Sequence, residues 1–178
     1  MRRNIVKMLI LIFIYLLVAV PFKVMVVIPG FADIRPVTAL GPIYALFFDL
    51  PGCIVFALLN LVMDIASDSL RWSSIAGLIA NFAGPYLLSL YWTRSSNKKL
   101  DLRTPLNVFE FAVTLILSAV LQAAIITPSV AATYDDVNAL TFAVSVILNT
   151  ALFPIVIGIP VIILLKEEFG YKFAKTYH

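Results

Sequence analysis

The sequence predicts an all-α membrane protein, a bundle of about six transmembrane helices that forms a single integral membrane domain over residues 1–178. The chain is 62% hydrophobic and 13% charged, with a mean hydropathy of +1.01. Soluble domains have roughly 45–50% apolar and about 25% charged residues. The apolar residues also fall in long runs, which Pro-Gly pairs and short charged segments separate. A soluble core of this size has no room for that excess, so the lipid bilayer is expected to surround the chain.

Six apolar segments approach the length of a transmembrane helix, which is about 20 residues with a range of about 17–25. They cover residues 5–28, 34–50, 52–66, 73–91, 106–127 and 139–165. The second and third segments are short, and Pro51-Gly52 joins them. They are expected to be either two tilted helices or a re-entrant pair buried by its neighbours. The first segment has too long an apolar run for a cleaved signal peptide.

The basic residues predict the orientation. Ten of the thirteen lie at the two ends of the chain or between residues 93 and 105, namely Arg2, Arg3, Lys7, Arg94, Lys98, Lys99, Arg103, Lys166, Lys172 and Lys175. The connection at residues 128–138 has Asp135 and Asp136 and no Lys or Arg. Because Lys and Arg are enriched in cytoplasmic loops, we expect a multi-pass protein of the cell membrane with both termini cytoplasmic. Trp72, Tyr91 and Trp92 would then lie at the membrane interfaces as an aromatic belt of anchors.

Several functions are excluded by what the sequence lacks. Cys53 is the only cysteine and His178 the only histidine, which argues against disulfides, histidine catalysis and a Cys or His metal site. Nucleotide-binding and hydrolase motifs are absent, and no folded domain offers a basic face for nucleic acid. We therefore expect neither an enzyme nor a cofactor. Energy for uphill transport would have to come from a partner or an ion gradient.

Polar residues inside the apolar segments converge on the predicted outer half of the bundle. Asn60 and Asp64 lie four residues apart on one helix face, as do Gly77 and Asn81. Such groups usually face a cavity, a partner or the bundle interior. The candidate ligand-binding residues are Asp33, Arg35, Asn60, Asp64, Trp72, Asn81 and Gln122, with Trp72 as a stacking wall and with Asn149 and Thr150 nearer the midplane. This pattern predicts a small-molecule pocket that opens to the outside.

A structural interpretation competes with the pocket. Arg35 and Asp64 would neutralise each other, since charges in membranes usually pair. The Asn and Gln side chains would link helices, at roughly 0.6–2 kcal/mol each. Rows of small residues, such as Ala80 and Gly84, would pack helices together or dock a partner. Asp49 is expected to be solvated at a cytoplasmic turn.

Seven short motifs follow one another between residues 28 and 92. They are Pro29-Gly30, Asp33, Ile34-Arg35-Pro36, Ala39-Leu40, Pro51-Gly52, Asn60 with Asp64, and Gly77 with Asn81-Phe82. This order resembles the integral-membrane substrate-binding (S) components of energy-coupling factor transporters. The chain departs from that family at Phe48-Asp49-Leu50-Pro51, where many relatives have Phe-Gly-Pro, and its first helix lacks their small-x-x-x-small pattern.

The resemblance implies a six-helix protein that binds a vitamin or other micronutrient from outside. It also implies a transmembrane coupling component and two cytoplasmic ATPases as partners. Two alternatives come from other classes. One is a non-transport scaffold or sensor of the same architecture, and the other is a small ion-coupled carrier in which Asp64 is the coupling acid.

Overall fold

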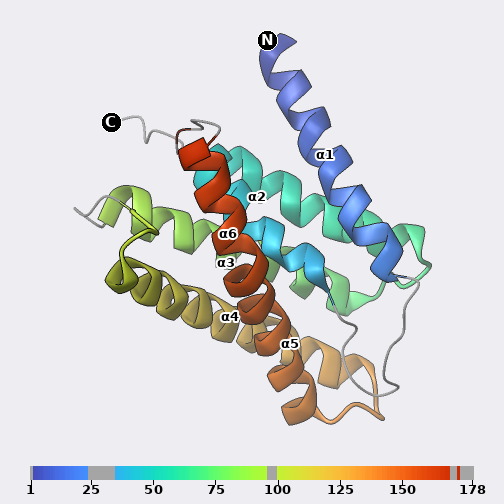
Figure 1. Ribbon diagram of the computed structural model, residues 1–178. Helices are drawn as coiled ribbons and strands as arrows, with labels where there is room; N and C mark the ends of the chain where they lie inside the picture. The colour runs from blue at the N-terminus through green and yellow to red at the C-terminus, as the bar shows by residue number, and fades with distance from the viewer. Residues whose placement is uncertain (1, 24–34, 96–99, 169–171, 173–178) are drawn as a thin grey trace.

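The computed structural model describes residues 2–23, 35–95, 100–168 and 172, and within these ranges the chain is helical without any strand. Its helices are α1 (Arg2–Lys23), α2 (Leu40–Ala66), α3 (Trp72–Leu90), α4 (Pro105–Thr133), α5 (Ala139–Phe153) and α6 (Ile159–Ile163). Short turns of 3₁₀ or π type extend them, namely η1 (Pro36–Ala39), η2 (Tyr91–Ser95), η3 (Pro154–Gly158) and η4 (Leu164–Glu168). Figure 1 shows α1 at one edge against α2, with α3 and α4 antiparallel and α5 to η4 crossing them.

Four helical segments of the described chain are long and apolar enough to cross a membrane. They are Pro36–Ala66, Trp72–Thr93, Pro105–Thr133 and Ala139–Glu167, and α1 adds a shorter apolar stretch, Leu9–Pro21. The chain is therefore an all-α membrane protein. The last predicted segment is one continuous rod, although Pro154 opens a π-helical turn within it. The predicted helix at 106–127 is longer than expected, because Pro128 lies inside α4 without ending it.

The two short segments predicted at 34–50 and 52–66 form one helical segment that folds back on itself. At the bend Asp49 has φ 50° and ψ −137°. A Cβ added to Gly52 would collide with the Tyr44 carbonyl and lie 2.9 Å from the Phe48 Cβ. Because eight residues of a straight helix rise about 12 Å, Tyr44 and Gly52 meet only if the chain reverses between them.

This hairpin has a short and a longer half, at residues 36–48 and 50–66. They span about 20 Å and about 26 Å, less than the roughly 30 Å hydrocarbon core. Every residue from Pro36 to Phe47 is buried, so the first half lies inside the bundle. The second half exposes Ile54, Leu58 and Val62 on its outer face, so only the first half is buried by its neighbours.

An aromatic cluster holds α1 against this hairpin. The Tyr15 and Phe56 rings meet edge to face at 5.7 Å, and Tyr44 meets Phe56 at 6.1 Å. The Tyr44 hydroxyl also donates a hydrogen bond to the Leu11 carbonyl. Tyr15 and Tyr44 are each 1% exposed, so these contacts form part of the core.

The small residues in rows pack inside the bundle. Ala80 and Ala119 are fully buried, and Gly84 of α3 lies directly against Gln122 of α4. Small side chains at these positions let the helix backbones approach closely. Large apolar residues cover the outer faces instead, as Phe13 and Leu117 show with more than 60% exposure, and these faces are suited to lipid.

Candidate functional site

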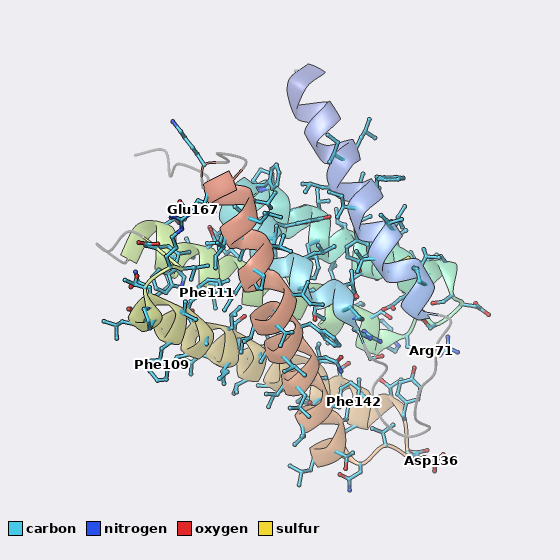
Figure 2. All side chains as sticks on the ribbon, viewed as in Figure 1. Arg71, Phe109, Phe111, Asp136, Phe142 and Glu167 are labelled. Atoms are coloured by element: carbon cyan, nitrogen blue, oxygen red, sulfur yellow. The ribbon has the colours of Figure 1, made fainter. Side chains whose placement is uncertain are left out.

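One end of the bundle encloses a cavity of about 530 Å³. Side chains from the hairpin, α3, α4 and α5 line it. The lining comprises Arg35, Val37, Thr38, Phe56, Asn60, Asp64, Ser67, Ser69, Ser73, Ser74, Gly77, Asn81, Gln122, Ile126, Val130, Tyr134, Val137, Phe142, Val146, Asn149 and Thr150. Figure 2 shows Arg71, Phe142 and Asp136 at this end of the molecule and Glu167 at the other.

Five of the seven predicted ligand-binding residues meet around this cavity. Arg35 precedes η1, and Asn60 and Asp64 come from the second half of the hairpin. Asn81 comes from α3 and Gln122 from α4. The fold thus joins four parts of the chain that are distant in sequence. Asp33, a sixth predicted residue, lies outside the described residues.

Trp72 does not line the cavity. Its side chain is 80% exposed at the first turn of α3, on the same face as the exposed Ile75 and Ile79. The following residues Ser73 and Ser74, about 100° and 200° further around the helix, line the cavity instead. The predicted stacking wall therefore points away from the site, and the aromatic rings that line it belong to Phe56, Tyr134 and Phe142.

Asn149 and Thr38 join α5 to the start of the hairpin. The Arg35 backbone N–H donates to Asn149 Oδ1 at 2.9 Å, and Asn149 Nδ2 donates to the Ser145 carbonyl at 3.0 Å. The Thr38 hydroxyl lies 2.8 Å from the carbonyl oxygens of both Arg35 and Asn149. Asn149 thus has the helix-linking role that the sequence left open for amides. The sequence did not single out Thr38 as a candidate site residue, because one hydroxyl in an apolar run gives little indication of a functional site.

The other amides of the cavity do not link helices. Asn81 Nδ2 donates to the Gly77 carbonyl at 2.8 Å, and Gln122 Nε2 lies 3.3 Å from Ser118 Oγ, so each bonds within its own helix. In the described part of the chain the Asn60 side chain makes no hydrogen bond, although it lines the cavity. Buried amides normally find partners. These three therefore present hydrogen-bonding groups to whatever fills the cavity.

A guanidinium and a carboxylate share the same cavity. Arg35 and Asp64 both line it. Ser67 and Ser69 close the hairpin end beside them, where the Ser69 hydroxyl donates to the Asp64 carbonyl at 3.2 Å. The cavity therefore combines charge, amides and hydroxyls with apolar walls, which is the composition of a small-molecule pocket.

The opposite end of the bundle pairs its polar groups with one another. The Tyr91 hydroxyl donates to Glu110 at 2.9 Å, and the Trp92 indole N–H donates to Thr114 at 3.0 Å. Trp92 is 5% exposed, so it is a core residue rather than the predicted interface anchor. Asp49, predicted to be solvated, accepts a hydrogen bond of 3.1 Å from the Ser89 hydroxyl.

Within the described ranges, no group of three or more His, Cys, Asp or Glu side chains could hold a metal ion. Comparison of the chain with protein-family models, with curated proteins and with solved structures finds no match. The functional interpretation therefore depends on the site itself.

Proposed function

We propose that this protein binds a small molecule, a vitamin or other micronutrient, from outside the cell for uptake, as the substrate-binding component of an energy-coupling factor transporter. One observation carries the proposal: within the described part of the chain, the amides of Asn60, Asn81 and Gln122 have no partner on another helix. Their cavity of about 530 Å³ falls in the range of roughly 300–1,000 Å³ that is usual for ligand pockets.

The orientation is part of this proposal. Both termini would be cytoplasmic and the cavity would open to the outside, with the hairpin halves counted as two of six helices. Arg103 and Lys166 lie at the end opposite to the cavity, where the Lys166 ammonium donates to the Leu100 carbonyl at 2.7 Å. Figure 1 shows the start of α1 and the end of η4 remote from the α4–α5 connection. Positive charge at the far end supports a cytoplasmic location there.

The partners are proposed for an energetic reason. The sequence has no nucleotide-binding loop, so ATP-driven uptake would need separate ATPases. A membrane coupling component and two cytoplasmic ATPases would supply this energy, and the lipid bilayer would surround the outer apolar faces.

The test is purification of the tagged full-length protein from native membranes in mild detergent, followed by native mass spectrometry. A stoichiometric small molecule is expected, and its loss from the Asn60→Leu variant would assign it to this cavity. Co-purifying ATPases would support the transporter assignment. A chain that is empty but bound to other membrane proteins would instead favour a scaffold or sensor.

Asp64 gives one reason to keep an ion-coupled carrier as a second candidate, because this carboxylate lines the cavity. A carrier would transport its solute in proteoliposomes without ATPases. Uptake would then depend on the proton gradient, and the Asp64→Asn variant would abolish that dependence. Uptake that requires ATP and added partners would exclude the carrier.

A further inference from the structure

The deep end of the cavity can be identified from a second, much smaller cavity beneath it. This void of about 10 Å³ reaches the core residues Pro42, Pro85 and Leu115. It shares part of its lining with the large cavity, and the shared residues are Thr38, Phe56, Asn81, Gln122 and Thr150. We call these five residues the cavity floor.

The two hydroxyl groups of the floor already donate their hydrogens to backbone carbonyls. Thr38 Oγ1 is 2.8 Å from each of two backbone carbonyls, and Thr150 Oγ1 donates to the Val146 carbonyl at 2.7 Å. A hydroxyl has one hydrogen and two lone pairs. Each of these oxygens can therefore only accept a hydrogen bond from a ligand.

One amide of the floor, that of Asn81, also leaves its oxygen available as an acceptor. Asn81 Nδ2 faces a carbonyl, and because only an NH₂ group can donate there, the orientation of this amide is determined. In the described chain no group donates to Asn81 Oδ1 or Gln122 Oε1, and neither is among the fully buried unpartnered atoms. The floor thus presents three acceptor atoms, namely Thr38 Oγ1, Thr150 Oγ1 and Asn81 Oδ1. The Gln122 amide adds either an acceptor or a donor, because its partner Ser118 Oγ can bond both ends of an amide.

Donors gather nearer the mouth. Ser74 Oγ accepts from the Arg71 backbone N–H at 3.2 Å, which leaves its hydrogen available. The Ser73 and Tyr134 hydroxyls and the Asn60 amide lie along the same side or rim of the cavity. The Asp64 carboxylate also lines this outer part, so donors and acceptors are mixed there, whereas acceptors predominate at the floor.

We propose that the ligand enters with a donor-rich end first, so that two or more of its N–H or O–H groups meet the floor. This inference deepens the proposed function and rests on it. It selects a neutral or cationic molecule with amino, amide or hydroxyl groups at that end. A carboxylate or phosphate there would face acceptors, and the unpaired oxygens on both sides would oppose binding. Ile126 and Val146 provide apolar wall for the body of the molecule.

The first experiment counts the donors directly. The molecule released from the purified protein is weighed in H₂O and in D₂O, since every N–H or O–H hydrogen exchanges for deuterium. More than one exchangeable hydrogen is expected, on an end of the molecule that has no anionic group. A molecule without exchangeable hydrogens, or one with an anionic group at every end, would overturn this inference and leave binding itself intact.

A matched pair of variants places those donors at the floor. Thr150→Val keeps the shape of the side chain and removes the acceptor, and should weaken binding by about 5- to 10-fold. Thr150→Ser keeps the hydroxyl and should bind like the parent. Thr114→Val, at the opposite end, is the control for a general effect of the change. Equal affinity of the Thr150→Val and Thr150→Ser variants would overturn the inference.

If the protein purifies empty, benzamide and methyl benzoate serve as probes, because they share a ring and a carbonyl and differ in the N–H donors. Stronger thermal stabilisation of the full-length protein by benzamide supports the inference. Equal stabilisation, or preference for methyl benzoate, overturns it alone. Stabilisation by neither probe overturns the proposed function together with it.

Discussion

The two ends of the bundle use polar side chains in opposite ways. At the end with Trp92, polar groups of neighbouring elements satisfy one another, as the Tyr91–Glu110 and Trp92–Thr114 hydrogen bonds show. At the cavity end, Asn60, Asn81 and Gln122 have no partner on another helix among the described residues. Both ends belong to the same apolar bundle. Polarity within a membrane segment therefore indicates function only when the protein itself leaves the group unsatisfied.

The largest expected effect is at the hairpin bend. Gly52→Ala places a methyl group against the Tyr44 backbone carbonyl, which has no flexible end to move aside. Such overpacking costs about 3 kcal/mol or more, so the variant should aggregate or lose most of its monodisperse protein in detergent. Gly77→Ala is the matched control, since its new Cβ would meet only Asn60 Nδ2 at 3.8 Å. A Gly52→Ala protein as heat-stable as the parent would contradict the reversal at Asp49.

The next effect concerns ligand affinity. Asn60→Leu removes an amide that makes no hydrogen bond within the described chain, so the melting temperature of the empty protein should hold or rise. Loss of one or two ligand hydrogen bonds should weaken binding by about 10- to 100-fold in calorimetry. Tyr91→Phe should do the reverse, with lower thermal stability and unchanged affinity. Unchanged affinity in Asn60→Leu would remove this residue from the site.

A smaller effect should come from Gly84, which touches no ligand in this arrangement. A Cβ at this position would lie 2.5 Å from Gln122 Nε2 and 2.7 Å from Gln122 Cγ. Because the Gln122 side chain is flexible, Gly84→Ala should displace it with little loss of stability. Ligand affinity should fall by about 10-fold, the value of one hydrogen bond. If Gln122→Ala in the same background weakened binding further, the displacement mechanism would be wrong.

The smallest predicted effect concerns the strain at Asp49. With φ near 50° and ψ near −137°, this residue occupies a region that glycine tolerates and other residues do not. Asp49→Gly and Asp49→Ala both lose the hydrogen bond from Ser89. Only the glycine relieves the backbone, so its free energy of unfolding should exceed that of the alanine variant by about 1 kcal/mol. Thermal denaturation of the two proteins side by side measures this difference, and equal midpoints would rule out the strain.

Much of the molecule could be predicted from local patterns. The apolar runs at 73–91, 106–127 and 139–165 correspond to α3, α4 and the rod from α5 to η4, because hydrophobic length is nearly independent of packing. Five candidate site residues surround one cavity because polar groups in apolar helices avoid lipid. The prediction that Trp72 forms a wall of the pocket was wrong, since composition alone does not give the rotation of a helix about its axis.

The sequence by itself determined the class of protein and the extent of the last three apolar helical segments, because both depend mainly on the transfer of side chains from water to lipid. The tertiary structure alone decided which of those groups are satisfied. Position 149 and position 60 are both asparagine, in similar apolar runs. Asn149 accepts a hydrogen bond from the Arg35 backbone, whereas the Asn60 side chain lines a cavity and has no hydrogen-bond partner in the described chain. Hydrogen bonding requires two groups to meet, and only the packing of the helices brings them together.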